Sequence, residues 1–285
     1  MVQDRHRPRV GCVEYLNARP LIRGWPGQVT LDNPATLCAQ LARGELDVAL
    51  VSSFEFLRNP IYRIVDGVSI SSRGPVYSVI VAHHGNISEI DEIELDPASE
   101  TSVNLLRCLL AERGLSPRLV RNIDFQSVRP AASHSAESKI PEKISASHTG
   151  SMPMFRSGAR LLIGDQAIRF RQKFGDAYRY WDLGEEWHGL TKLPFVYALW
   201  LVRPEVFDPE SIADRLRALR DKNLAKIDKL IAEESEFDHE FCARYYREHL
   251  QFNFGEKEKQ GLLGFQRLCE KHGLLPKREV EFNLV

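Results

Sequence analysis

Residues 46–53 are Leu46-Asp47-Val48-Ala49-Leu50-Val51-Ser52-Ser53. An apolar run of this length that is rich in valine and leucine is typical of a strand buried on both faces of a sheet. Two serines follow the run directly, at the strand end where α/β proteins bind their ligands. The stretch therefore predicts an α/β protein with polar groups at the carboxyl edge of its sheet.

The neighbouring segments alternate between strand and helix patterns, as a sheet covered by helices requires. Asn33-Pro34 predicts a helix start, because asparagine caps a helix and proline suits its first position. Strands are predicted over 9–14, 28–32, 46–51, 62–71, 76–83, 118–123, 159–163 and 193–202. Helices are predicted over 33–44, 99–114, 208–231, 236–250 and 257–272, with a further helix from 166 after a Gly164-Asp165 turn.

The length and composition predict two lobes of ordinary size. The chain has 285 residues, of which 43% are hydrophobic and 27% charged, as is usual for folded proteins. We expect residues 1–83 and 197–285 to form one lobe and residues 84–196 the other. Residues 127–157 are rich in serine, alanine and histidine with little periodicity, which indicates a flexible loop or an insertion.

The charge balance and the lack of long apolar segments exclude several classes of protein. Thirty-eight Lys and Arg face 39 Asp and Glu, so no net positive field favours nucleic acid. No window approaches the about 20 apolar residues of a membrane span, and residues 1–9 do not resemble a signal peptide. We therefore expect a cytoplasmic protein with no nucleic-acid or membrane partner, and a monomer or a weak homodimer.

The sequence carries no recognisable catalytic or metal motif. It has no phosphate-binding loop, dinucleotide fingerprint, nucleophile elbow or zinc-protease motif. The nine histidines are dispersed, and His83 and His84, as neighbours on a strand, point to opposite faces. The five cysteines show no metal-ligand spacing and are expected to be reduced and buried. We expect no metal and no cofactor.

Hydroxyl, amide and glycine residues recur where strands end and helices begin. The segments are Tyr15–Arg19, Ser71–Ser78, Ser99–Ser102 and Gly164–Gln166. Serine or threonine at a helix start is usually a simple cap, so each segment alone is weak evidence. Together they predict a cleft between the lobes that binds a small carboxylate, because helix N-termini and strand ends offer donors to anions.

The opening Val10-Gly11-Cys12-Val13-Glu14-Tyr15-Leu16-Asn17-Ala18-Arg19-Pro20-Leu21 resembles the start of the chorismate dehydratases of the futalosine-type menaquinone pathway. Further similarities lie at Leu46–Val51, Gly74–Val79, Thr101–Val103 with Leu105, Leu162–Asp165, Leu193–Val196 with Ala198 and Trp200, and Gly261–Phe265. They are collinear over nearly the whole chain. Residues 127–157 match nothing in the family, and Lys192 stands where a glycine is expected, which would affect the hinge or the cleft rim.

The resemblance implies a bilobal, periplasmic-binding-protein-like (type II) α/β fold with a central cleft. It implies a lyase that dehydrates chorismate to 3-[(1-carboxyvinyl)oxy]benzoate without a cofactor. The C3 proton and the C4 hydroxyl leave, and the ring becomes aromatic. Because aromatisation is strongly downhill, the enzyme mainly has to fix a reactive conformer and stabilise the departing hydroxyl.

Positions matching the family suggest a role for each site residue. Asn17 is expected to orient the enolpyruvyl side chain or the leaving hydroxyl, and Ser78 to bond near the reacting carbons. Thr101 and Ser102, at a helix N-terminus, are expected to hold a carboxylate. The remaining expected substrate-binding residues are Tyr15, Arg19, Ser71, Arg73, Gly74, Gly164 and Asp165.

The proton acceptor is not evident from the sequence. Glu14 and Asp165 are candidates by position, although structural hydrogen bonding is the commoner role for such residues. We hypothesise that the substrate's own enolpyruvyl carboxylate takes the C3 proton. Two alternatives stay open: an enzyme like the 1,4-dihydroxy-6-naphthoate synthase of the same pathway, and a non-catalytic cytoplasmic protein that binds a small carboxylate.

Overall fold

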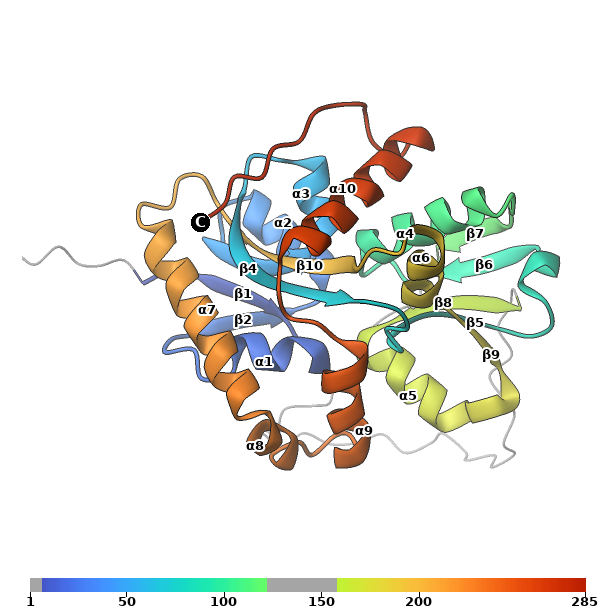
Figure 1. The fold of residues 1–285 in the computed structure, drawn as a ribbon, viewed down its shortest axis with the longest axis horizontal. Helices are drawn as coiled ribbons and strands as arrows, with labels where there is room; N and C mark the ends of the chain where they lie inside the picture. Colours follow the sequence, from blue (N-terminus) through green and yellow to red (C-terminus); the bar gives the residue numbers. More distant parts are fainter. Residues whose placement is uncertain (1–6, 122–157) are drawn as a thin grey trace, which may run out of the picture.

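A computed structural model describes residues 7–121 and 158–285 (Figure 1). The stretch 127–157, predicted as a loop or insertion, lies outside the described residues. So do the last two residues of the strand predicted over 118–123, whose described part is a strand.

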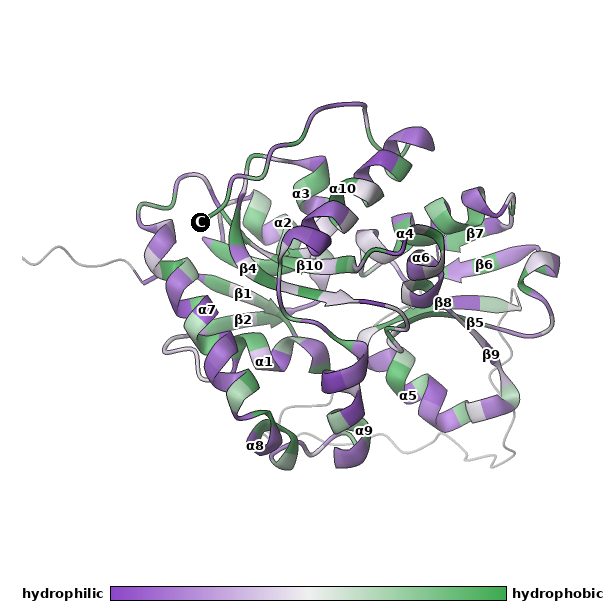
Figure 2. Ribbon diagram, viewed as in Figure 1, coloured by the Kyte–Doolittle hydropathy of each residue, from purple (hydrophilic) through white to green (hydrophobic). Residues whose placement is uncertain are grey.

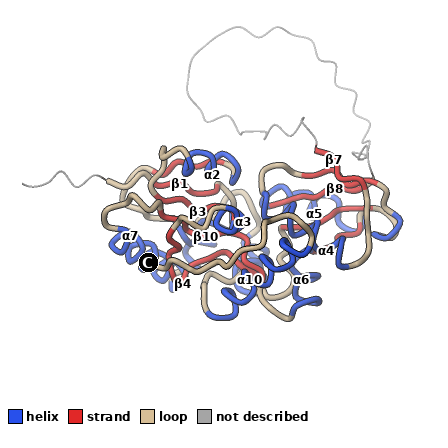
Figure 3. Tube along the Cα trace, turned by 90° about the horizontal axis from the view of Figure 1, so that it is seen from above, coloured by secondary structure: helices blue, strands red, loops and turns tan. Residues whose placement is uncertain are grey.

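The described chain forms two five-stranded sheets. The first has the order β2-β1-β3-β10-β4 and the second the order β7-β6-β8-β5-β9. The strands of the first are β1 (Val10–Val13), β2 (Val29–Asp32), β3 (Val48–Ser52), β4 (Arg63–Ser72) and β10 (Phe195–Val202). Those of the second are β5 (Val79–His83), β6 (Glu92–Leu95), β7 (Arg118–Arg121), β8 (Ala159–Ile163) and β9 (Arg179–Asp182). Figure 3 shows the two sheets in separate halves of the molecule, here called the first and second lobes.

Helices cover both sheets. The first lobe carries α1 (Arg19–Ile22), α2 (Pro34–Ala42), α3 (Ser53–Arg58), α7 (Pro209–Ala225) and α8 (Ile227–Ala232), and the second carries α4 (Glu100–Glu112), α5 (Gly164–Phe174) and α6 (Leu183–Thr191). The C-terminal part adds α9 (His239–Arg244), the π-helix η4 (Tyr245–His249) and α10 (Glu256–Lys271), and short 3₁₀ turns lie at Leu16–Ala18, Ile87–Glu89 and Gly175–Ala177. Figure 2 shows hydrophobic residues along β1 and hydrophilic ones along β6, and both kinds of residue along α7 and α10, as burial of one helix stripe requires.

The predicted buried strand is at the centre of the first sheet. All five residues of β3 are buried. It pairs in parallel with β1 and antiparallel with β10, so side chains on both of its faces are covered and an unbroken apolar run is favourable. Its carboxyl end, Ser52, points the chain toward the second lobe, where the backbone N–H of Thr101 donates to its hydroxyl at 3.0 Å.

Both ends of the described chain belong to the first lobe. Strand β1 lies inside the first sheet, and Val285 exchanges backbone hydrogen bonds with the edge of β4 near Ile64. The chain crosses to the second sheet between Ser72 and Val79 and returns before Phe195. Strand β5 pairs with β8 and β9 and so belongs to the second sheet, whereas the predicted boundary after residue 83 places it with the first lobe.

Two predicted helix boundaries are wrong. The helix predicted over 208–231 is split, because the backbone of Lys226 (φ −120°, ψ 31°) leaves the helical range between α7 and α8. The Gly164-Asp165 turn is the first turn of α5 itself, and Gly164 with φ +56° turns the chain directly from β8 into that helix. Strands β6 and β9 and helices α3 and α6 were not predicted.

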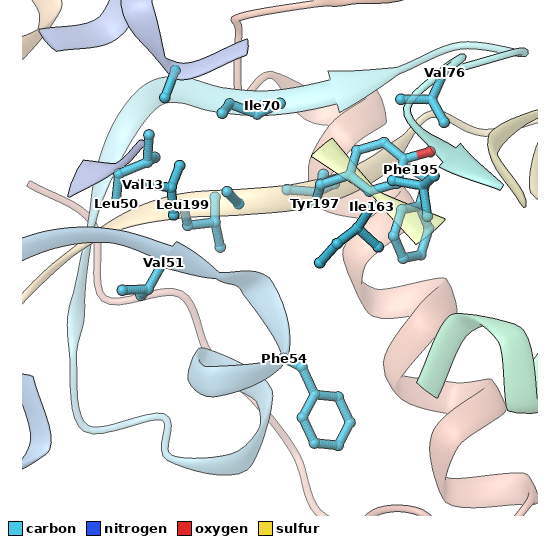
Figure 4. Packing of buried hydrophobic residues seen from close by; sticks show 14 of the residues in the cluster. Val13, Leu50, Val51, Phe54, Ile70, Val76, Ile163, Phe195, Tyr197 and Leu199 are labelled. Carbon is cyan, nitrogen blue, oxygen red and sulfur yellow. The ribbon is translucent and has the colours of Figure 1, made fainter. Parts of the chain in front are cut away.

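Apolar packing is continuous from the first lobe to the second. Val76 and Ile163, which come from the second lobe and its crossing, belong to the same buried cluster as Ile70 and Tyr197 of the first lobe. Figure 4 shows Val76, Ile163 and Tyr197 close together. The two lobes are therefore joined by a continuous buried apolar cluster.

Candidate functional site

A cavity lies between the two sheets. The first lobe contributes Val13, Tyr15, Asn17, Pro34, Ser52, Ile70, Tyr197 and Ala198, and the second lobe with its crossing contributes Val76, Ser78, Val79, Ser99, Ser102, Ile163 and Gly164. Its walls are apolar, while its polar groups are hydroxyls and one amide. No arginine, lysine, aspartate or glutamate is among these described lining residues. Such a site orients a ligand by hydrogen bonds within a water-poor enclosure.

The loop after β1 carries the first group of predicted residues. Asn17 lies in the turn Leu16–Ala18, and its Oδ1 atom is buried without a hydrogen-bond partner among the described residues. Leaving such an acceptor unpaired costs about 1–3 kcal/mol, so an orphan oxygen in a cavity wall indicates a ligand partner. Asn17 therefore lies in the wall of the cavity, and its role there stays a prediction.

Tyr15 packs against Gly164 across the cleft. A Cβ atom at position 164 would lie 2.9 Å from three ring atoms of Tyr15, a distance that carbon contacts do not reach. Only glycine leaves room for this ring, and the positive φ of Gly164 also favours glycine. The pair joins the two lobes at the cavity wall.

Ser78 and Asn17 are linked by a residue that the sequence did not single out for the site. The hydroxyl of Tyr245, in η4, donates a 2.7 Å hydrogen bond to Ser78 Oγ. The Asn17 side chain also bonds to this hydroxyl, and burial raises the pKa of Tyr245 above its usual range. A π-helix is rare and concentrates at functional sites, but no sequence pattern announces one. Tyr245 therefore had no detectable signal.

The N-terminus of α4 is arranged differently from the expectation. Ser102 lines the cavity, and its hydroxyl and backbone N–H both bond to Ser99, the residue that caps the helix. Thr101 is turned away, because successive helix residues point about 100° apart. Its hydroxyl bonds to Ser52 and accepts from the Phe54 N–H at 2.9 Å. Ser52 and Ser99 replace Thr101 in the cavity lining.

Asp165 supports the site from behind. Its Oδ1 accepts the backbone N–H of Leu16 at 2.9 Å, and it does not line the cavity. Burial raises the pKa of Asp165 to about 6, against the lowering effects of that hydrogen bond and of nearby Arg19. Burial likewise raises the pKa of Asp96 to about 6.

The other predicted binding residues lie outside the cavity lining. Arg19 pairs with Glu234 and Glu236, which neutralise it. Ser71 hydrogen-bonds to the backbone of Gln251. Arg73 is exposed, and Gly74 (φ +107°) shapes the crossing, with its carbonyl accepting from Ser72 at 3.1 Å. Within the segment Ser71–Ser78, only Val76 and Ser78 line the cavity.

A second cavity of about 200 Å³ lies between α2, α3 and the start of α4, and shares Pro34 and Ser52 with the first. Its charged groups satisfy one another, because Glu55 bonds to Arg58 and Asn59, and Arg58 also bonds to Glu100. The cavity at Asn17 holds about 50 Å³ but has the orphan acceptor. We therefore take the smaller cavity as the candidate site.

Within residues 7–121 and 158–285, no group of three or more His, Cys, Asp or Glu residues is placed to hold a metal ion. None of the helices described there is long and apolar enough to cross a membrane. His84 lies beyond the end of β5, so it does not share a strand with His83. All five cysteines are buried free thiols, as expected.

Solved structures establish the fold. A protein of Archaeoglobus fulgidus superposes with a TM-score of 0.64 at 17% identity over 95% of this chain and 100% of its own. The periplasmic aliphatic sulphonate binding protein of Escherichia coli superposes with a TM-score of 0.58 at 14% identity over 95% of this chain and 94% of its own. The expected bilobal, periplasmic-binding-protein-like α/β fold is confirmed.

Sequence comparison identifies the family. The chorismate dehydratase of Thermus thermophilus is 27% identical over 282 residues, covering 91% of this chain and 94% of that protein. The family profile described as menaquinone biosynthesis matches residues 8–138 and 134–271, so the matched segments include residues 127–157, where no similarity to the family was expected. Since these matches extend over most of the chain and follow the resemblance noted in its motifs, the protein belongs to the menaquinone biosynthesis family.

Proposed function

We propose that this protein is a chorismate dehydratase, which converts chorismate to 3-[(1-carboxyvinyl)oxy]benzoate and water in the cavity at Asn17. The observation that carries the proposal is the buried, unpartnered Oδ1 of Asn17 in a lining of hydroxyl groups. The choice of chorismate as the substrate rests on the similarity to the Thermus thermophilus chorismate dehydratase.

The cavity suits a reaction that needs positioning more than acid–base catalysis. Loss of the C3 proton and the C4 hydroxyl makes the ring aromatic, so a rigid set of hydrogen bonds that selects the reactive conformer is sufficient. We assign Asn17 to the leaving hydroxyl or the enolpyruvyl chain and Ser78 to the reacting edge of the ring. Ser102, with Ser99 and the start of α4, is assigned to a carboxylate.

The proton acceptor is proposed to be the enolpyruvyl carboxylate of the substrate. Glu14 is exposed and Asp165 is engaged with Leu16, and neither is among the lining residues of the cavity. A general base has to lie within hydrogen-bond reach of the proton it removes. The position of both carboxylates behind or outside the cavity wall supports the substrate as its own base.

We further propose that the protein acts in the cytoplasm as a monomer or weak homodimer. Five buried, unpaired thiols are compatible with a reducing compartment. The thiols of Cys108 and Cys269 are hydrogen-bonded to each other, with their sulfur atoms 3.8 Å apart, and are not joined by a disulfide.

Purified protein incubated with chorismate and no added cofactor tests the proposal. Chromatography and mass measurement should show the aromatic enol ether replacing chorismate at a rate proportional to enzyme concentration. Chorismate that binds but is recovered unchanged would instead make the chain a binding protein, a role that the fold of the Escherichia coli sulphonate binding protein permits. If the protein does not bind chorismate, the result would contradict the proposal and favour the alternative of an enzyme like the 1,4-dihydroxy-6-naphthoate synthase.

A further inference from the structure

Tyr245 is a buried residue that bonds to both groups assigned to the reaction. It is fully buried, lies in η4, and is not among the residues that line the cavity. Its hydroxyl donates to Ser78 Oγ at 2.7 Å, across 167 positions of sequence. Because Tyr245 supplies the hydrogen of that bond, the hydrogen of Ser78 is directed elsewhere. Ser78 lines the cavity, so that hydrogen is available to a ligand.

The same phenol orients Asn17. Burial raises the pKa of Tyr245, and interactions of its hydroxyl with the side chains of Ser78 and Asn17 oppose that rise. Because the buried Oδ1 of Asn17 has no hydrogen-bond partner among the described residues, we assign the amide nitrogen of Asn17 to the interaction with Tyr245. The Tyr245 hydroxyl therefore determines which atom of the Asn17 amide, and which atom of the Ser78 hydroxyl, is available to a ligand in the cavity.

We propose that Tyr245 is a positioning residue for the dehydration, which fixes Ser78 as a hydrogen-bond donor and Asn17 as an acceptor toward the substrate. This proposal rests on the proposed function. Both residues line the same cavity, so the donor and the acceptor can hold two different atoms of a single ligand. Without the phenol, Ser78 can rotate its hydrogen and the Asn17 amide can turn over.

The surroundings of Tyr245 hold the ring in place. Its ring stacks on Phe241 with centroids 5.5 Å apart and planes inclined by 16°. The hydroxyl of the next residue, Tyr246, donates to the backbone oxygen of Leu16 at 2.9 Å and ties η4 to the loop of Asn17. Burial keeps the phenol neutral, because it raises the pKa of Tyr245. The hydrogen that Ser78 accepts is therefore retained over the ordinary pH range.

Tyr245→Phe tests the proposal, because it keeps the ring and removes only the hydroxyl. We expect kcat on chorismate to fall about 10-fold to 100-fold, with a smaller change in KM. Tyr180→Phe is the matched control, since it removes a tyrosine hydroxyl that bonds to the Gly175 carbonyl at 2.8 Å outside the cavity. It should leave kcat unchanged. Thermal unfolding of both variants reports any loss of folding.

A double-mutant cycle with Ser78→Ala separates positioning from a merely structural role. If Tyr245 acts through Ser78, the double variant Ser78→Ala/Tyr245→Phe should retain most of the activity of Ser78→Ala alone, with only the Asn17 contribution lost. Near-wild-type kcat for Tyr245→Phe, or effects that multiply fully, would overturn the proposal. If the wild-type protein binds chorismate without converting it, the proposed function fails. The same double-mutant cycle, measured on dissociation constants for chorismate, then tests whether Tyr245 positions Ser78.

Discussion

The carboxylate of Asp165 accepts a 2.9 Å hydrogen bond from the backbone N–H of Leu16. Asp165 is the second residue of α5 in the second lobe, and Leu16 immediately precedes Asn17 in the first. This hydrogen bond therefore joins the two lobes next to Asn17. Ser78, held by Tyr245, completes the arrangement from the start of β5.

Asn17→Ala should reduce turnover of chorismate by about 100-fold to 1000-fold, since it removes a buried, unpartnered acceptor from a residue that lines the cavity. Folding should be little affected, because the lost oxygen has no partner among the described residues and the amide nitrogen loses only its interaction with Tyr245. Steady-state kinetics and thermal unfolding measure the two quantities. Near-normal kcat would remove Asn17 from the mechanism.

Asp165→Asn should change how stability depends on pH. Burial raises the pKa of Asp165 to about 6, whereas an unfolded aspartate has a pKa of about 4. Between about pH 4 and 6 the unfolded state loses this proton first, so the free energy of unfolding of the wild type falls as pH rises through that range. The asparagine still accepts the Leu16 N–H and does not ionise.

The difference in unfolding free energy between Asp165→Asn and wild type should therefore grow from pH 4 to pH 7, by up to about 3 kcal/mol in favour of the variant. Denaturant unfolding at several pH values measures this difference. A difference that is constant over the range would mean that Asp165 is not buried as an acid.

Gly164→Ala should destabilise the protein by about 1–3 kcal/mol and lower turnover, because the new Cβ would meet the Tyr15 ring at 2.9 Å on a backbone with φ +56°. Gly189→Ala in α6 is the control, since a Cβ there meets nothing within 4 Å. The control should be neutral or slightly stabilising. Equal effects of the two substitutions would argue against the Tyr15–Gly164 contact.

Lys192→Gly should stabilise the protein by about 1 kcal/mol. Lys192 ends α6 with φ +62°, a left-handed conformation that costs an L-residue about 1–2 kcal/mol and that glycine adopts freely. This explains why a glycine is expected at that position from the family resemblance. Lys192→Ala keeps the Cβ and should show no such gain in thermal unfolding.

The parts of the fold that the sequence predicts are those where burial is uniform. Strands β3 and β10 are buried at every residue, so their apolar runs are unmistakable. Strand β6 was missed because Glu94 interrupts its pattern. That glutamate is buried and pairs with Arg160 of the neighbouring β8, a partner that only the sheet order reveals.

The site was predictable where a strand end carries the residue into the cavity. Asn17 and Ser78 follow or precede a strand, and both lie at the cavity wall. Thr101 was misplaced because its helix start was recognised but the direction of its side chain was not. Tyr245 was missed because its role depends on a contact between distant segments.

The turnover number of a Glu14→Gln/Asp165→Asn double variant on chorismate distinguishes catalysis by positioning from catalysis by a protein base. Neither carboxylate lines the cavity, so we expect kcat within about 10-fold of the wild type, the range of an indirect effect on the loop of Asn17. Abolished turnover in a double variant that folds and still binds chorismate would contradict the assignment of the substrate carboxylate as the base.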